Sequence, residues 1–205
     1  MNDFTILHLS DLHINGKGKN LSRMMKNLLE DIEQETKVVE NIIIVVTGDL
    51  VHQAKYRECE KSVELFFEKL KEILNDKICD VYFVPGNHDK KHGVLDDTLL
   101  KEYTFEQSDE FYQKYWSYVN VGYLDYLKLV QKLTRILIGQ DITIENTYGV
   151  RTTEIKDKGK RICFLSFDTS WSSKGGGKDE RALKLGKFQV EQMLKQYESD
   201  CANVD

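Results

Sequence analysis

The chain has 205 residues and a formal net charge of −5, with 40% hydrophobic and 31% charged residues. This length is enough for one well-buried domain, and the acidic balance argues against a surface dedicated to nucleic acid, although a local basic groove stays compatible with it. No apolar run approaches the roughly 20 residues of a membrane-spanning helix, and no amino-terminal segment reads as a secretory signal. Because the four cysteines also lack CxxC spacing, we expect a cytoplasmic protein without a membrane partner.

The first half of the sequence alternates strand-like and helix-like segments. Three apolar runs predict strands, at 4–9, 41–46 and 81–84. Apolar residues recur at helical spacing between them, at about 21–32 and 63–74, and Asn20 or Ser22 is the candidate cap of the first helix. This β-α-β-α-β order predicts a parallel sheet with right-handed crossovers.

The second half begins with an aromatic stretch of helical character. Residues from about 95 to 138 predict two or three helices inserted beside the loops of the first half. Residues 143–155 and 161–167 predict an antiparallel pair of strands, joined by a turn at 157–160. The remaining segments are a polar, glycine-rich loop at 171–180 and a final helix at 186–197.

Polar side chains follow each of the three strands predicted in the first half. The strands lead into Asp11-Leu12-His13, Gly48-Asp49 and Gly86-Asn87-His88-Asp89. Loops at the carboxyl ends of parallel strands meet at one edge of a sheet, where ligands bind. Their carboxylate, amide and imidazole groups suit divalent ions such as Mn, Fe, Zn or Mg. In an extended segment Asp11 and His13 point to one face and can chelate one ion.

Each motif alone also has a plain structural explanation. Gly, Asn and Asp are common turn residues, and an Asp-x-His triplet often arises by chance. The occurrence of all three in order, each after a predicted strand, is harder to explain by turns.

These segments resemble the N-terminal part of the calcineurin-like metallophosphoesterase family. That family carries Asp-x-His, Gly-Asp and Gly-Asn-His followed by Asp or Glu, and the matching segments here are Ile6–His13, Val46–Leu50 and Val84–Asp89. The resemblance is specific over about 4–89 and continues weakly through 162–170 and 186–195. It implies an α/β fold of the metallophosphoesterase type, an α-β-β-α sandwich with a helical insertion at about 95–138.

The resemblance also implies two divalent metal ions. By position, Asp11 and His13 would bind the first ion, Asp49 would bridge the two ions, and Asn87 would bind the second. A hydroxide between the ions would be the nucleophile, because bound metals lower the pKa of water.

Three further roles follow for the phosphoester substrate. His88 would contact the phosphate and assist the leaving group, and Asp89 would orient His88. Asn87 and His88 would bind substrate, and His52 is added to them because it follows the Gly-Asp turn closely enough to line the same cleft.

One part of the family pattern has no counterpart in this sequence. The family completes its site with a later histidine and a Gly-His-x-His segment, whereas the last histidine here is His92. The first ion would then keep three of its four protein ligands, and the second ion only Asp49 and Asn87, which predicts a weak second site. We therefore expect residues 1–205 to form a truncated metallophosphoesterase domain with an incomplete second sheet, completed by further domains or a partner chain.

The resulting expectation is an enzyme that hydrolyses phosphomonoesters or phosphodiesters, with nucleotides and nucleic acids among the candidate substrates. Two alternatives stay open: a degenerate, non-catalytic regulatory or scaffolding module, and a nuclease subunit of a larger assembly.

Three other positions carry smaller expectations. We expect His8 to be a buried, hydrogen-bonded histidine of the core and Asp168 to have a structural hydrogen-bonding role. The run Lys90-Lys91-His92 is a candidate for attracting phosphate.

Overall fold

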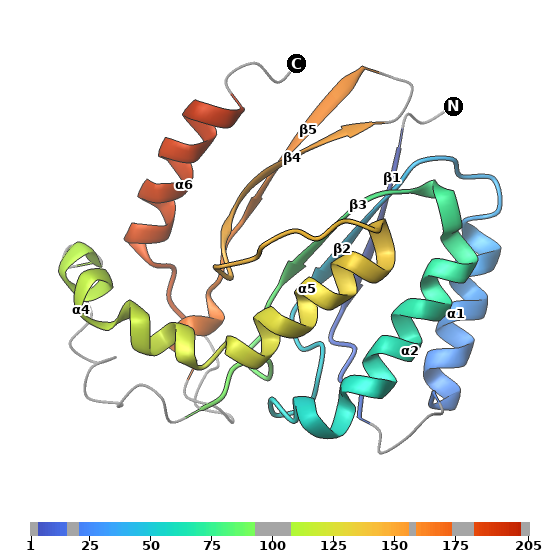
Figure 1. The fold of residues 1–205 in the computed structure, drawn as a ribbon, viewed down its shortest axis with the longest axis horizontal. Helices are drawn as coiled ribbons and strands as arrows, with labels where there is room; N and C mark the ends of the chain where they lie inside the picture. Colours follow the sequence, from blue (N-terminus) through green and yellow to red (C-terminus); the bar gives the residue numbers. More distant parts are fainter. Residues whose placement is uncertain (1–3, 16–20, 93–107, 156–158, 174–182, 202–205) are drawn as a thin grey trace.

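The computed structural model of the protein contains two β-sheets that lie face to face, with helices along their outer sides (Figure 1). The structure describes residues 4–15, 21–92, 108–155, 159–173 and 183–201. The strands are β1 (Thr5–Ser10), β2 (Ile42–Thr47), β3 (Ile78–Val84), β4 (Gly149–Ile155) and β5 (Lys160–Ser166). The helices are α1 (Arg23–Glu35), α2 (Tyr56–Leu74), α4 (Ser108–Val121), α5 (Leu124–Ile138) and α6 (Lys187–Asp200), with 3-10 turns at Asn75–Lys77 and Ser170–Ser172. The expected α/β architecture with a small second sheet is confirmed.

The first sheet has the order β1-β2-β3, and all its neighbours are parallel. β2 is buried on both faces, as its uninterrupted apolar sequence predicts. Ile42, Ile44 and Val46 belong to the large core under the helices, whereas Ile43 belongs to the smaller core between the sheets. The alternation of side chains along one central strand therefore holds both cores together.

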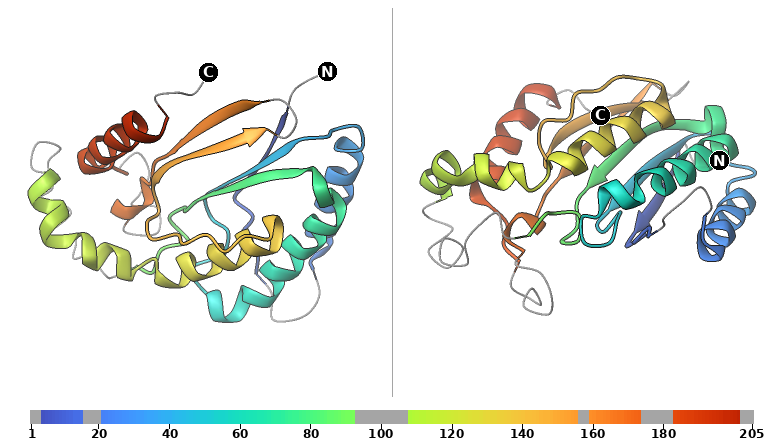
Figure 2. Two further views of the ribbon diagram at one scale, coloured as in Figure 1. Left: turned by 45° about the horizontal axis from the view of Figure 1, so that its top comes forward. Right: turned by 60° about the horizontal axis from the view of Figure 1, so that its bottom comes forward.

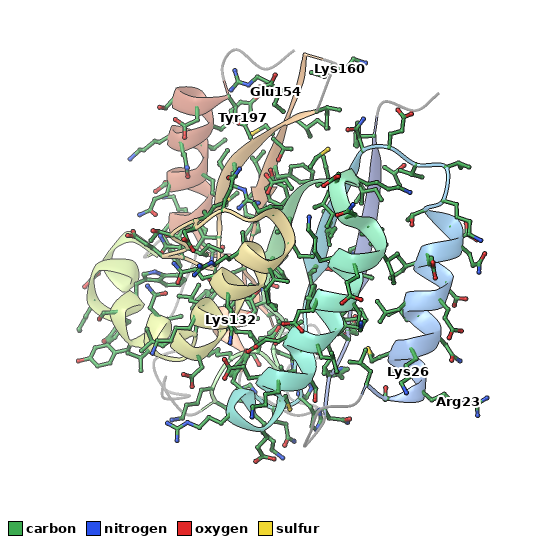
Figure 3. All side chains as sticks on the ribbon, turned by 45° about the vertical axis from the view of Figure 1, so that its right-hand side comes forward. Arg23, Lys26, Lys132, Glu154, Lys160 and Tyr197 are labelled. Carbon is green, nitrogen blue, oxygen red and sulfur yellow. The ribbon has the colours of Figure 1, made fainter. Side chains whose placement is uncertain are left out.

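α1, α2 and α5 cover the outer face of the first sheet (Figure 2). The predicted cap of α1 is confirmed for Ser22, whose Oγ accepts a hydrogen bond from the backbone N–H of Met25 at 3.2 Å. Lys132 lies on α5 and is labelled in Figure 3. It donates to Glu60 at 3.3 Å and to Glu64 at 2.5 Å, both on α2. α5 thus lies beside α2 in the layer that covers the sheet. The start of the predicted 95–138 insertion lies outside the described residues, and its role as a cap stays a prediction.

The second sheet packs on the inner face of the first through aromatic and polar contacts. The ring of Tyr82 on β3 stacks on Phe164 of β5, with ring centroids 4.0 Å apart. Asp80, also on β3, accepts a hydrogen bond from Arg151 at 2.7 Å and one from Thr153 at 2.5 Å. Carboxylate-to-arginine contacts of this kind add geometric specificity to the packing of the two sheets.

β4 begins at Gly149, so the prediction of a strand from residue 143 is wrong for 143–148. Side chains of this segment are engaged elsewhere: the hydroxyl of Thr147 donates to Asp168 at 2.5 Å, and that of Tyr148 donates to Gln192 of α6 at 2.7 Å. α6 itself covers β4, where Gln196 exchanges hydrogen bonds with the backbone N–H and C=O of Val150. Most of the predicted loop at 171–180 lies outside the described residues.

Within the described residues, β5 pairs with β4 alone. From its place in an incomplete sheet, β5 is expected to leave Ile162, Phe164, Leu165 and Phe167 as an uncovered apolar edge. This is wrong for Ile162 and Phe164, which are partly buried and pack on the core between the sheets. Leu165 and Phe167 are the exposed members of the strand end, at 41% and 38%.

This edge gives a prediction about association. Open strand edges pair with other chains, and each Å² of apolar surface that is covered contributes about 25 cal/mol. We expect the purified chain to self-associate, or to capture a partner, through β5, and Leu165→Lys to shift it toward the monomer. Light scattering after size exclusion measures this, with Leu124→Lys, at the exposed first residue of α5, as the matched control. A strictly monomeric wild-type chain would contradict the prediction.

Candidate metal centre

The three candidate loops lie together because the parallel ladder continues past the ends of the strands. The backbone N–H of Asp11 donates to Gly48 O at 3.2 Å, and that of His13 donates to Asp49 O at 2.8 Å. On the other side, Gly48 N–H donates to Val84 O at 2.8 Å. The loops are therefore held by the same kind of hydrogen bond as the strands that carry them.

The backbone of these loops is strained. Asp11, His13 and Asp49 have φ values of 53°, 41° and 47°, in the left-handed region that residues with a Cβ rarely adopt. The expectation that Asp11 and His13 lie in an extended segment is therefore wrong, although their side chains do come together. Strained residues persist where the surrounding structure over-determines them, and they cluster at functional sites.

Gly86 allows the third loop to approach the second. A Cβ at this position would lie 2.1 Å from Asp49 Oδ1 and 2.4 Å from Asp49 N, so no larger residue fits. The close approach lets the backbone N–H of His88 donate to Asp49 Oδ1 at 2.9 Å. The Gly-Asn-His segment and the Gly-Asp segment thus form one unit.

Two carboxylates and an imidazole converge at this unit. The candidate ligand atoms of Asp11, His13 and Asp49 all lie within 4.8 Å of one another, and His13 Nε2 is 3.6 Å from Asp49 Oδ2. Asp49 is only 7% exposed, and Asp11 accepts a hydrogen bond from the hydroxyl of Ser10. Two carboxylates this close repel each other, and a divalent ion relieves the repulsion. The donor set therefore fits a divalent metal ion, as predicted.

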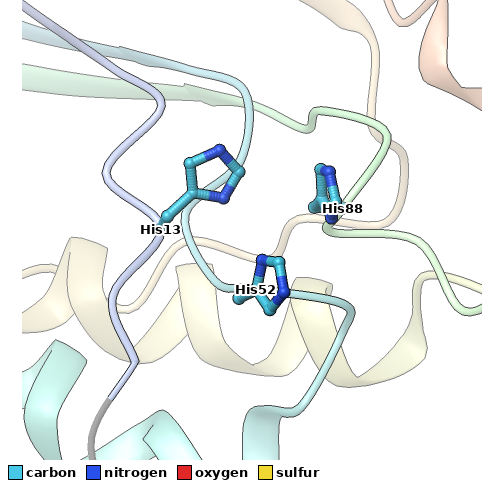
Figure 4. Close-up of side chains that lie close together, drawn as sticks. All are labelled: His13, His52 and His88. Carbon is cyan, nitrogen blue, oxygen red and sulfur yellow. The ribbon is translucent and has the colours of Figure 1, made fainter. Parts of the chain in front are cut away.

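The remaining candidate residues border this set. Asn87 is half-buried on the loop between Gly86 and His88. The ring of His88 lies edge-on to that of His13, with centroids 5.0 Å apart, and stacks on that of His52 at 5.2 Å (Figure 4). The three predicted loops do bring Asp11, His13, Asp49, His52 and His88 together at one end of the sheet, and Asn87 lies on the third of these loops.

A family model described as calcineurin-like phosphoesterase matches residues 4–196. The chain belongs to this family. The match extends well beyond the three motifs and includes β4, β5 and most of α6, so it confirms the resemblance inferred from residues 4–89. Neither the curated proteins nor the solved structures contain a significant match. Because the chain belongs to this family, the chemistry suggested for the site is metal-dependent hydrolysis of phosphoesters.

Asp89 has a different role in this member of the family from the expected one. Its carboxylate is fully buried and accepts hydrogen bonds from the backbone N–H groups of Leu50, Val51 and Gly86, at 3.1, 3.2 and 3.0 Å. Burial raises the pKa of this carboxyl to about 7, and the backbone N–H groups oppose that rise. Asp89 therefore ties the second loop to the third, and the expectation that it orients the ring of His88 is wrong in this structure.

Lys90 is also buried, at 1% exposure, so the expectation that it attracts phosphate at the surface is wrong. Its ammonium group donates to the backbone O of Trp171 and, at 3.1 Å, to that of Ser173. The structural role expected for Asp168 is confirmed: it is fully buried and accepts hydrogen bonds from Ser170 N at 2.8 Å and Trp171 N at 3.2 Å. The burial of Lys90 could not be predicted from the sequence, because the carbonyl groups that it contacts lie more than 80 residues away along the chain.

His8 is hydrogen-bonded to Thr47 at 2.6 Å, as expected, but it is exposed and not part of the core. In the part of the chain that the structure describes, none of the helices combines the length and apolar character needed to cross a bilayer.

Proposed function

We propose that this chain carries the metal centre of a metal-dependent phosphoester hydrolase. The observation that supports it most is the convergence of Asp11, His13 and Asp49 within 4.8 Å, at the carboxyl ends of the neighbouring parallel strands β1 and β2, in a chain of the calcineurin-like phosphoesterase family. In this proposal Asp11 and His13 hold one divalent ion, Asn87 holds a second, and Asp49 faces both.

Divalent ions bound here would activate water for attack and neutralise charge on the phosphoryl group. The residues of the chain supply positioning. Asp49 is fixed by the N–H of His88, and the C=O of His88 is fixed by the N–H of Ala54 at 2.7 Å. His88 is thereby held with its ring beside the ion site, where we propose that it contacts the phosphate and passes a proton to the leaving oxygen. His52 stacks on that ring and limits its rotation.

The number of protein ligands available to each ion limits the catalytic activity that we expect of this chain. Asp49 and Asn87 are two donors for the second ion, and a site with two donors is weak. We therefore propose that full activity needs additional histidine ligands from another segment or a partner chain, which would also cover β5. The four free thiols are compatible with our proposal of a cytoplasmic location.

Hydrolysis of aryl phosphate esters tests this function. With manganese, the 205-residue chain is expected to hydrolyse an aryl phosphodiester or monoester very slowly. If the gene continues past codon 205 with a histidine and Gly-His-x-His, the longer protein should be far faster. In that protein His88→Ala should lower kcat about 10²–10⁴-fold, and Asp49→Asn should also abolish rapid turnover.

His8→Ala and Asp31→Asn are the matched controls, because both replace an exposed residue of the same type outside the site. High turnover by the 205-residue chain would overturn the assignment of missing ligands. A longer protein that binds manganese at Asp49 and does not turn over any ester would instead favour the non-catalytic alternative.

A further inference from the structure

Three imidazoles from three different loops meet at one point. His13, His52 and His88 follow β1, β2 and β3, and their ring centroids lie 5.0, 5.2 and 5.8 Å apart (Figure 4). One ring nitrogen from each lies within 4.8 Å of those of the other two. All three rings are half-buried, so the cluster is shielded and still reachable from solvent.

Two ring nitrogens of this cluster lack a hydrogen-bond partner. Nδ1 of His13 and Nδ1 of His88 are buried and have no partner among the described residues. Buried polar atoms are almost always paired, and an exception calls for an explanation such as an unseen ion. Histidines that serve only to pack would be expected to place these nitrogens against a donor or an acceptor.

The cluster is also held in place by the backbone. The N–H of Ala54 donates to His88 O at 2.7 Å, which ties the loop of His52 to the loop of His88. The N–H of His13 donates to Asp49 O at 2.8 Å, which ties the first loop to the same unit. The three imidazoles are therefore brought together by the fold itself, as in a preformed ligand set.

We propose that His13, His52 and His88 form a nitrogen-only metal site that takes zinc-type ions in place of the oxygen-rich set of Asp11, His13 and Asp49. Imidazole suits Zn, Cu and Ni, whereas carboxylate and amide oxygens suit Mg and Mn. Zinc–nitrogen bonds of about 2.0–2.1 Å in a tetrahedral site place the nitrogens about 3.3 Å apart. Rotation of the side chains closes the difference from 4.8 Å, and water completes the fourth position.

His13 belongs to both the three-histidine set and the set of Asp11, His13 and Asp49, so it can serve only one of the two ion sites at a time. An ion on the three histidines also engages His88, the group that we place against the phosphate. Zinc in excess would therefore withdraw one ligand and one substrate contact from the hydrolytic site at the same time. This inference goes beyond the proposed function, since it concerns ion binding and holds whether or not the chain turns over an ester.

Ion titrations of the full 205-residue chain, free of affinity tags and stripped of metal, test the proposal. Zinc and manganese are titrated separately against a competing chromophoric chelator. The variants are His52→Gln, Asp11→Asn and, as the matched control, exposed His8→Gln. His52→Gln should weaken zinc binding about tenfold or more and leave manganese affinity nearly unchanged. Asp11→Asn should do the reverse, and His8→Gln should change neither.

X-ray absorption of the zinc-loaded chain supplies a readout that does not depend on variants. Three imidazole nitrogens at about 2.0–2.1 Å are expected. A single imidazole with oxygen ligands, or zinc affinity that falls in Asp11→Asn and not in His52→Gln, would overturn the proposal and leave the hydrolytic site intact. Failure of the proposed function would look different: manganese would not bind, while zinc would still depend on His52.

Discussion

Replacing Asp89 by asparagine is expected to lower the free energy of unfolding by about 1–3 kcal/mol. One carboxylate oxygen accepts from the N–H groups of Leu50 and Gly86, and the other accepts from that of Val51. An amide has only one accepting oxygen, so its NH₂ group must face a backbone N–H. In the better orientation the amide oxygen still accepts from Leu50 and Gly86, and its NH₂ group can donate to the hydroxyl of Tyr56, 3.4 Å from the other carboxylate oxygen. The buried N–H of Val51 then lacks an acceptor, at about 1–3 kcal/mol. Urea unfolding followed by circular dichroism, with a chelator present, measures the loss.

The measurement belongs at pH 8, because the pKa of Asp89 is about 7 and the wild-type carboxylate should be ionised. Asp168→Asn is a matched buried control with a different expected outcome. One oxygen of Asp168 accepts from the backbone N–H groups of Ser170 and Trp171, and the other faces the hydroxyl of Thr147, which can accept from an NH₂ group. This variant should lose less stability than Asp89→Asn, and exposed Asp31→Asn should lose almost none. Equal losses for the two buried variants would mean that Asp89 does not tie the loops specifically.

The sequence was sufficient for the topology and for the place of the site. Three apolar runs separated by helical periodicity predict parallel strands, and parallel strands bring the loops that follow them to one edge. Asp11, Asp49 and His88 are found together for this reason, although 38 and 39 residues separate them along the chain. A helix capped at Ser22 was predictable from local chemistry alone.

Features that depend on distant partners were not predictable in this way. The carboxylate of Asp89 faces the buried N–H groups of Leu50 and Val51 in the second loop, and not the ring of His88. Lys90 is buried and donates hydrogen bonds to the backbone carbonyls of residues 171 and 173, and no local sequence pattern predicts these contacts. The left-handed backbone at Asp11 and His13 is likewise held by hydrogen bonds to the neighbouring loop, which the local sequence does not indicate.

Manganese is expected to raise the melting temperature of the chain, and Asp49→Asn is expected to abolish this effect. Without an ion, the carboxylates of Asp11 and Asp49 repel by about 1–4 kcal/mol at 4 Å, for effective dielectrics between those of water and a protein surface. An ion that binds the folded state alone adds about 2.7 kcal/mol at 100 times its dissociation constant.

Metal-free Asp49→Asn should melt no lower than the wild type, because the change removes the repulsion and its amide oxygen can still accept from His88 N–H. Thermal melts in millimolar manganese, zinc and magnesium provide the measurement, and Asp31→Asn should keep the full shift. A melting temperature that none of the three ions changes would show that the fold does not preform a metal site. A shift that survives Asp49→Asn would place the ion elsewhere. If it survives only for zinc, the ion would lie on the nearby histidines, which share His13 with the carboxylate set but do not need Asp49.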